Sequence, residues 1–305
     1  MIVETRPEGQ RSTITLLAAS LRPEQWTKNL LLFAGLLFGG RFLQPVGVIR
    51  AVAAFAIFCA LSGAIYLVND IWDRDVDRRH PLKKARPIAS GSLPTKMAAW
   101  SAAALIGGAI IAAWLLNAAL GGIAVAYVLL LFLYSTSLKH FVIVDVLTIA
   151  GGFVLRAVAG AVAVDVPIGS WLLACTTLLA LFLALSKRRH EIILLGDNAS
   201  RHRPSLEHYS PYLLDQMIAV VTASTVIAYA LFAMSADTAE RLGTPRLGFT
   251  IPFVLYGIFR YLYLVHQKRG GGSPSAMLLT DRPLLVCVGL WAGTVVLLMY
   301  SPLGC

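Results

Sequence analysis

Charged side chains are scarce in this 305-residue chain: Asp, Glu, Lys and Arg make up 14% of it, against 57% hydrophobic residues. A soluble domain carries about 25% charged residues, so the composition excludes an ordinary soluble globular protein. Cysteine is also rare, and none of the four cysteines forms a CxxC pair, which argues against a zinc site or a disulfide framework. The formal charge of +10 does not indicate nucleic-acid binding, because no basic soluble domain is present to offer a surface for it.

Long apolar runs account for most of the sequence. Continuous apolar stretches of about 18 to 22 residues predict membrane-spanning helices rather than the strands of a barrel. Nine are expected, near residues 29–47, 50–69, 97–116, 118–134, 141–164, 168–186, 213–235, 247–266 and 283–300. The sequence therefore predicts an all-α membrane protein. It would have a cytoplasmic N-terminal segment at residues 1–28 and a single polytopic transmembrane catalytic domain at residues 29–305.

Lysine and arginine are unevenly divided between the two sides of such a protein. If nine spans alternate in direction, nearly all basic residues of the loops fall on one side. The other side receives only Arg41, Arg50, Arg241 and Arg246. The positive-inside rule then places the N-terminus and the basic loops in the cytoplasm and the C-terminus outside. We therefore expect a multi-pass protein of the inner membrane, whose first span is retained because no cleavable signal precedes it.

Oxygen-bearing side chains gather where the second span is expected to end: Asn69, Asp70, Asp73, Asp75 and Asp77. Residues four apart share one face of a helix, so Asn69, Asp73 and Asp77 are expected to form a stripe. Hard oxygen ligands suit Mg²⁺, whose shell is completed by water and substrate phosphates. The predicted Mg²⁺ ligands are Asn69, Asp70, Asp73 and Asp77, with Asp73 and Asp77 as catalytic residues. The alternative is a solvated, charge-rich helix end.

The loop that follows these acids is basic. It contains Lys83, Lys84 and Arg86, and then Pro87 and Gly91, which favour a reversal of the chain. A metal ion would neutralise one side of a bound diphosphate, and Lys83 and Arg86 are predicted to bind its other side. The alternative is that these cations only anchor the loop on the cytoplasmic side of the membrane.

Four motifs in residues 22–165 form a specific combination. They are Asn69-Asp70-x-x-Asp73-x-x-x-Asp77, Arg86-Pro87 with Ser90-Gly91, Tyr134-Ser135-x-x-Leu138-Lys139 followed by Asp145, and Gly152-Phe153-x-Leu155-Arg156-x-x-x-Gly160. Together they resemble the UbiA superfamily of intramembrane prenyltransferases. The resemblance implies nine transmembrane helices around a central cavity that opens sideways to lipid. It also implies Mg²⁺ held by aspartates on the cytoplasmic side.

The chain departs from that superfamily in one respect. Ordinary members carry a second aspartate cluster between the sixth and seventh spans, whereas this chain reads Lys187-Arg188-Arg189-His190-Glu191 there. The sequence therefore favours a site in which one metal-bound diphosphate faces a phosphate held by Lys and Arg. It disfavours a site in which two acidic clusters bridge a single diphosphate. With Arg22-Pro23-x-Gln25-Trp26-x-Lys28-Asn29 and a late Asp281-Arg282, the chain resembles the decaprenyl-phosphate phosphoribosyltransferase branch.

This resemblance implies Mg²⁺-dependent transfer of a 5-phosphoribosyl group from 5-phosphoribosyl 1-diphosphate (PRPP) to a polyprenyl monophosphate. Pyrophosphate would be released, and the product would serve cell-envelope biosynthesis. The expected partners are the two substrates and the membrane. The residues expected to bind the substrates are Gln25, Lys28, Lys83, Arg86, Tyr134, Lys139, Arg156, Lys187, Arg188 and Glu191.

Several assignments stay open on the sequence alone. Arg156 lies well inside a span and could bind a phosphate or pair with Asp145 or Glu191. Tyr134 and Lys139 could bind a phosphate or anchor the chain at the membrane interface. The alternative functions are a prenyltransferase that uses prenyl diphosphate and a transporter or lipid-binding protein. A homo-oligomer is compatible with the sequence, which does not determine the oligomeric state.

Overall fold

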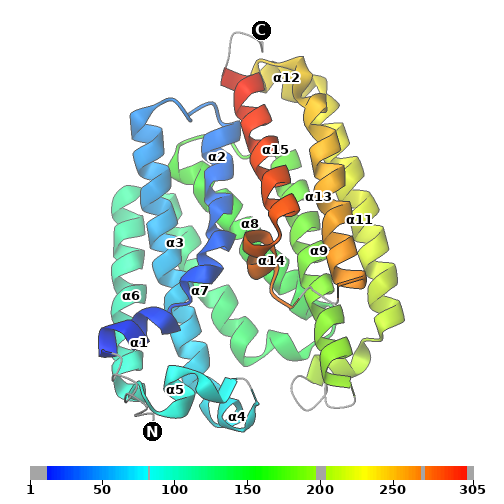
Figure 1. The fold of residues 1–305 in the computed structure, drawn as a ribbon. Coiled ribbons are helices and arrows are strands. Elements are labelled where there is room, and N and C mark those ends of the chain that lie inside the picture. The colour runs from blue at the N-terminus through cyan, green and yellow to red at the C-terminus, as the bar shows by residue number, and fades with distance from the viewer. Residues whose placement is uncertain (1–11, 82, 197–203, 269–271, 301–305) are drawn as a thin grey trace, which may run out of the picture.

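The computed structural model describes residues 12–81, 83–196, 204–268 and 272–300, and every regular element in these ranges is a helix (Figure 1). The long helices are α3 (Pro45–Trp72), α6 (Thr95–Leu116), α7 (Ala118–Thr136), α8 (Val144–Ala163), α9 (Ser170–Leu195), α11 (Pro211–Met234), α13 (Ile251–His266) and α15 (Arg282–Tyr300). The short α-helices are α1 (Thr13–Ser20), α2 (Phe33–Phe38), α4 (Arg74–Arg79), α5 (Pro87–Ser90), α12 (Ala236–Leu242) and α14 (Pro274–Thr280). The 3₁₀ segments are η1 (Pro23–Leu32), η2 (Lys83–Ala85), η3 (Leu138–His140), η5 (Pro204–His208) and η6 (Pro245–Thr250).

Eight helical segments in the described part of the chain are long and apolar enough to cross a membrane. They correspond to eight of the nine expected spans, with η6 and α13 forming one of them. The expected first span, 29–47, is not confirmed. Its residues form the end of η1, then α2, and then a turn in which Gly40 has φ +68°, while Pro45 already begins α3. Gly40, in a left-handed conformation, follows the end of α2, and Pro45 starts α3. The mean hydropathy of the stretch does not reveal this interruption.

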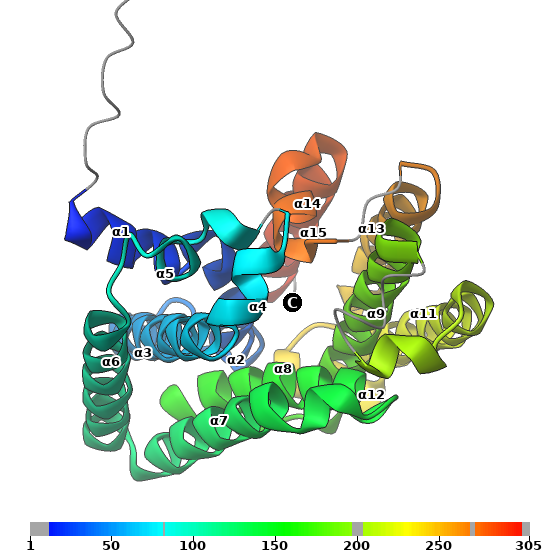
Figure 2. The ribbon, with the colours of Figure 1, turned by 90° about the horizontal axis from the view of Figure 1, so that it is seen from below.

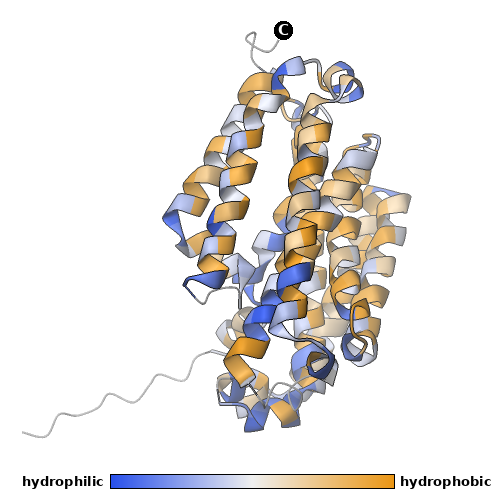
Figure 3. Ribbon diagram, turned by 90° about the vertical axis from the view of Figure 1, so that its right-hand side faces the viewer, coloured by the Kyte–Doolittle hydropathy of each residue, from blue (hydrophilic) through white to orange (hydrophobic). Residues whose placement is uncertain are grey.

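The helices run roughly parallel, and the short elements gather at the two ends of the bundle (Figure 1). We call the end that carries α1, α4 and α5 the site face, and the end that carries α12 the far face. The described chain begins at the site face and ends at the far face (Figure 1). Seen from below, α3, α8, α9, α13 and α15 are arranged around the middle of the bundle (Figure 2). Hydrophobic residues cover most of the helical length (Figure 3), as expected for helices in lipid.

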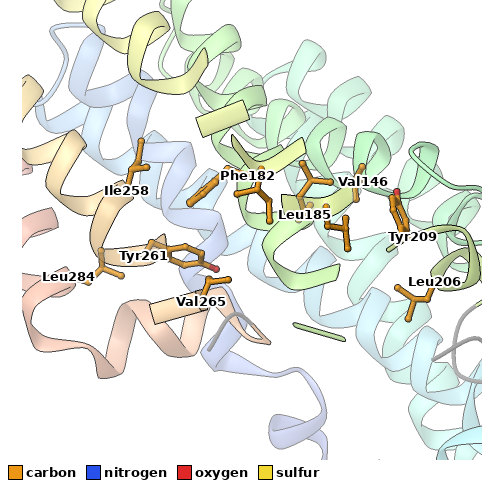
Figure 4. Packing of buried hydrophobic residues seen from close by; sticks show 12 residues of the cluster. Val146, Phe182, Leu185, Leu206, Tyr209, Ile258, Tyr261, Val265 and Leu284 are labelled. Carbon is orange, nitrogen blue, oxygen red and sulfur yellow. The ribbon is translucent and has the colours of Figure 1, made fainter. Parts of the chain in front are cut away.

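Two large hydrophobic clusters form the core, and α8 belongs to both. One joins α8, α9, α11, α13 and α15, and its buried members include Val146, Phe182 and Tyr209 (Figure 4). The other joins α3, α6, α7 and α8 and includes Leu32 of η1. Because α8 is packed on both sides, it holds the two halves of the bundle together and is a rigid element on which a site can be built.

The η1–α2 segment approaches α8 very closely through two glycines. A Cβ atom on Gly35 would lie 2.6 Å from the Cα of Ala161, and one on Gly160 would overlap the carbonyl oxygen of Leu32. Only residues without a side chain allow this backbone contact. It brings Asn29 of η1 against Arg156 of α8, which matters for the site described below.

Gly160→Ala is therefore expected to destabilise the protein by about 2 kcal/mol, because the added methyl group must push η1 away from α8. Thermal unfolding in detergent would measure this as a lower midpoint temperature. Gly122→Ala is the matched control, since nothing lies within 4 Å of the position of its Cβ. Equal midpoints for the two variants would contradict the close packing.

Candidate active site

A cavity of about 710 Å³ lies in the middle of the bundle. Toward the site face its lining includes Lys28, Asn69 and Lys187, and Arg156 lies deeper in α8. At the far face the cavity reaches Thr238 and Arg241 of α12. Arg241 thus lies at the end of the bundle opposite the site face, but it still lines the same cavity. Most of the wall between these ends is aliphatic or aromatic. The cavity can therefore take a molecule with a charged end and an apolar body.

The acidic residues stand at a break between two helices. α3 ends at Trp72, and Asp73 caps α3 and starts α4 with φ −87° and ψ 6°. The Asp73 N–H donates to the Asn69 carbonyl and the Asp77 N–H donates to the Asp73 carbonyl, each at 2.8 Å, so the four-residue spacing expected of these residues is kept across the junction. Asp70 and Asp77 contact one common side chain, and both are buried. Asp73 is less enclosed, with a side chain 39% exposed.

Four cations surround these acids. Arg86 Nη1 donates to Asp70 Oδ1 at 3.0 Å and to Asp77 Oδ2 at 2.6 Å. The other three contacts are Arg22 Nη2 to Asp70 Oδ1 at 2.5 Å, Lys83 Nζ to Asp77 Oδ1 at 3.9 Å and Lys139 Nζ to Asp73 Oδ1 at 3.5 Å. The predicted substrate-binding residues Lys83, Arg86 and Lys139 are thus brought together with the acids. The acids and cations offset one another and form one mixed cluster.

The donor set fits a divalent cation such as Mg²⁺ in its chemistry. Asp70, Asp73 and Asp77 supply carboxylate oxygens, and Asn69 Oδ1 is buried without a hydrogen-bond partner in the described part of the chain. Hard oxygen donors of this kind suit Mg²⁺. Among the described residues no three His, Cys, Asp or Glu side chains lie close enough together to hold a metal ion, and Arg86 occupies both Asp70 and Asp77. The residues therefore fit Mg²⁺ in the type of their donor atoms, and water or substrate oxygens would have to complete its shell.

Arg156 is held in place entirely by neutral groups. Its guanidinium donates to Asn29 Oδ1 at 2.7 Å, to the Gly152 carbonyl at 3.0 Å and to the Tyr127 hydroxyl at 2.5 Å. Neither acid that the sequence offered as a partner contacts it, and no described carboxylate forms an ion pair with it. A buried cation without a carboxylate partner, on the wall of a cavity, favours an anionic ligand there.

Lys28 strengthens the positive charge of this wall. It lies in η1, outside the eight spanning helices, and forms no ion pair among the described residues. Burial, together with the nearby charges of Arg156 and Arg22, lowers the pKa of Lys28 to about 8. The ammonium group therefore loses its proton more easily than that of an exposed lysine, and a bound anion would stabilise the charged form. Gln25, in the first turn of η1, lies close by in the sequence, and its backbone N–H donates to the Arg22 carbonyl.

Arg188 is engaged in a buried network. Its Nε donates to Asp145 Oδ2 at 2.8 Å, its Nη2 donates to the Tyr134 hydroxyl at 3.0 Å, and its Nη1 pairs with Glu191. The side chains of Arg188 and Asp145 are 1% and 0% exposed. The sequence predicts that Arg188 binds a phosphate, whereas the structure gives it carboxylate partners and a packing role. Lys187, whose side chain is 41% exposed and lies 3.9 Å from Glu191, reaches the cavity instead.

Sequence reasoning did not select several residues that define the site. Arg22 and Asp145 stand inside motifs singled out above, and their motif membership was the available signal. Asn29 also stands in such a motif, but its contact with Arg156 bridges 127 positions. Tyr127 carries no sequence signal, because one tyrosine in an apolar span resembles any other.

Arg188→Ala is expected to lower the free energy of unfolding by about 3 to 5 kcal/mol, because it leaves Asp145 as an uncompensated buried charge. Thermal unfolding and the yield of monodisperse protein in detergent would measure this loss. Lys187→Ala is the control, since its side chain is half exposed and its loss leaves no buried carboxylate unpaired. A stable Arg188→Ala protein would mean that the network is dispensable for folding.

Comparison with known proteins agrees with this architecture. Residues 30–282 match the UbiA prenyltransferase family. A decaprenyl-phosphate phosphoribosyltransferase of Corynebacterium glutamicum is 35% identical over 287 residues, which cover 92% of this chain and 86% of that protein. Another, from Mycolicibacterium smegmatis, is 32% identical over 294 residues, with coverage of 93% and 92%.

A solved structure of a UbiA homolog from Archaeoglobus fulgidus bound to GPP and Mg²⁺ has the same fold. It aligns with a TM-score of 0.72 at 20% sequence identity, over 93% of this chain and 98% of that one. The helical bundle, the motifs and the match over residues 30–282 lead to one conclusion: this chain is a member of the UbiA prenyltransferase family.

Proposed function

We propose that this protein transfers a 5-phosphoribosyl group from PRPP to a polyprenyl monophosphate and releases pyrophosphate. The observation that carries the proposal is the division of charge in the site. Acids and cations form one mixed cluster at the site face, whereas the cavity wall beside it carries Lys28 and Arg156 without carboxylate partners. The resemblance to relatives named decaprenyl-phosphate phosphoribosyltransferase supports the same reaction.

The mixed cluster is the proposed site of the donor diphosphate. Asn69, Asp70, Asp73 and Asp77 would hold Mg²⁺, which supplies charge neutralisation for the departing pyrophosphate. Arg86 and Lys139 contact the same acids from outside and would bind the phosphate oxygens that the metal leaves free. Negative charge that develops on the leaving group is thus met by fixed cations.

The cavity wall is the proposed site of the acceptor. Lys28, Lys187 and Arg156 would bind the lipid phosphate, and the isoprenoid tail would lie along the apolar lining. A phosphate monoester is already an anion at neutral pH, so its oxygen can attack C1 of the ribose without a general base. The new bond forms between that oxygen and C1 as the bond from C1 to the diphosphate breaks. In-line displacement predicts inversion at C1.

The proposed location is the inner membrane, with the site face toward the cytoplasm. Basic residues of the loops gather on that face, as the positive-inside rule requires of the cytoplasmic side. Both proposed substrates carry phosphate groups that would then approach from the cytoplasm.

The experiment that tests the function is a donor comparison with purified protein in nanodiscs. Radiolabelled PRPP with Mg²⁺ and a polyprenyl phosphate should give a labelled lipid and stoichiometric pyrophosphate. Geranyl diphosphate with an aromatic acid should give no pyrophosphate. The reverse result would assign the protein to the prenyltransferases that use prenyl diphosphate.

Asp73→Asn is expected to reduce transfer on the order of 100-fold, because an amide cannot supply the charge that a metal-bound diphosphate requires. The half-exposed position predicts little change in stability. Asp75→Asn is the matched control, since the Asp75 side chain is 82% exposed and pairs only with Arg78 at 3.8 Å among the described residues. Similar turnover for both variants, with equal melting temperatures, would remove Asp73 from the site.

The pKa of Lys28 predicts an alkaline limit on activity. Lys28 is charged below about pH 8 and neutral above it, so kcat/KM for the lipid phosphate should fall as the pH rises through about 8. Lys28→Arg keeps the charge and should move this fall to higher pH. Initial rates at limiting polyprenyl phosphate, measured between about pH 7 and pH 9 for the wild type and for Lys28→Arg, would test this shift. An identical alkaline limb in the variant would exclude Lys28 as its cause.

A further inference from the structure

The segment between α7 and α8 contains a strained turn. Ile143 has φ +67° and ψ −46°, and the Val144 N–H donates to the Val142 carbonyl at 2.8 Å. This is a γ-turn with a positive φ at its centre, a rare and strained conformation. A β-branched residue is the least suited to it. The Ile143 side chain is 48% exposed, so its own burial offers little compensation.

Tyr209 holds this turn from another part of the chain. It lies between η5 and α11, and its ring is buried in the core beside Val146 and Leu206 (Figure 4). Its hydroxyl accepts a hydrogen bond from the Ile143 N–H at 2.7 Å and donates one to Asp145 Oδ1 at 2.9 Å. Burial raises the pKa of Tyr209 to about 12, so the hydroxyl keeps the proton that it donates. The first of these bonds is made by the central residue of the turn itself.

The turn connects directly to the site. η3 immediately precedes it and carries Lys139, whose ammonium lies 3.5 Å from Asp73. The hydrogen bond from the Asp145 N–H to the Phe141 carbonyl joins the end of η3 to the start of α8. If Ile143 relaxed to a negative φ, the direction of the chain between α8 and η3 would change. Lys139 would then move relative to the acids.

We propose that Tyr209 is a positioning residue, whose hydroxyl clamps the Ile143 turn and so holds Lys139 against Asp73 at the donor site. The part that concerns donor binding rests on the proposed function, whereas the clamp itself does not. Sequence gives no hint of this role, because Tyr209 stands 66 positions from Ile143 and outside every motif discussed above.

The kinetic test measures KM for PRPP at saturating polyprenyl phosphate. Tyr209→Phe should raise KM about tenfold with a much smaller change in kcat, the size expected when a supporting hydrogen bond around a site is lost. Ile143→Pro should also raise KM, because proline fixes φ near −65° and lacks the N–H that donates to the Tyr209 hydroxyl. Ile143→Gly should stay within about twofold of the wild type, because glycine adopts a positive φ without strain.

The decisive variant combines Tyr209→Phe with Ile143→Gly. If the hydroxyl acts by holding the strained turn, glycine removes the strain and KM should return to within about twofold of the wild type. If Tyr209 serves only the core, glycine cannot repair the defect, and the proposal is overturned. A wild-type KM in Tyr209→Phe also overturns it. Should Tyr209→Phe fail to fold, the contrast between Ile143→Pro and Ile143→Gly decides in its place.

Hydrogen–deuterium exchange tests the clamp independently of activity. Peptides covering residues 138–147 should exchange faster in Tyr209→Phe than in the wild type. Tyr212→Phe is the matched control, because Tyr212 lies three residues further on and is 74% exposed. Unchanged exchange in Tyr209→Phe would refute the clamp. If the wild type transfers no phosphoribosyl group, the proposed function fails by itself, and the exchange result alone judges the clamp.

Discussion

The pairing of buried carboxylates with arginines is the constraint on which the site face depends. Asp70, Asp77 and Asp145 are each at most 3% exposed. A carboxylate that is buried without a partner costs several kcal/mol, so each needs a cation in a fixed place. Arginine meets this need because its planar group carries five donors. Arg86 thereby joins two acids, and Arg188 joins Asp145 to Glu191 and Tyr134.

These pairings also decide where the short elements lie. Arg86 immediately precedes α5, and its two contacts draw that helix against the α3–α4 break. Arg188 on α9 joins α8 through Asp145 and α7 through Tyr134. Arg156 stands apart from this pattern, because only neutral groups hold it. Arg86 and Arg188 thus neutralise acids of the protein itself, whereas the charge of Arg156 at the cavity wall is uncompensated.

Two residues with a positive φ, one before the acidic cluster in the sequence and one after it, carry backbone strain. Arg22 has φ +53° and Ile143 has φ +67°, and non-glycine residues seldom adopt such values. Each is held by contacts from distant parts of the chain. Arg22 lies over the Tyr66 ring and pairs with Asp70, while the Ile143 N–H is bound by Tyr209. Strain that persists because other elements hold it is common at functional sites, and here it fixes two segments that carry cations toward the acids.

The sequence by itself determined the class of this protein, its family and eight of its spans. An apolar run long enough to cross a bilayer is a local property, and so are the spacing of acids at its end and the motifs of the family. A ninth span at residues 29–47 is not confirmed, because Gly40 and Pro45 interrupt the apolar stretch there. Around Asp73 the helical spacing of the acids is kept, but the sequence did not show that one arginine, Arg86, would bind both Asp70 and Asp77.

Only the tertiary structure decided which charges pair. Arg188 reaches Asp145 across 43 positions, Arg156 reaches Asn29 across 127, and Tyr209 reaches Ile143 across 66. These contacts depend on how α8 packs against η1, α9 and the segment before α11. The reason is physical: a charge selects its partner by distance and burial, and both are set by the packing of helices that are far apart in the chain.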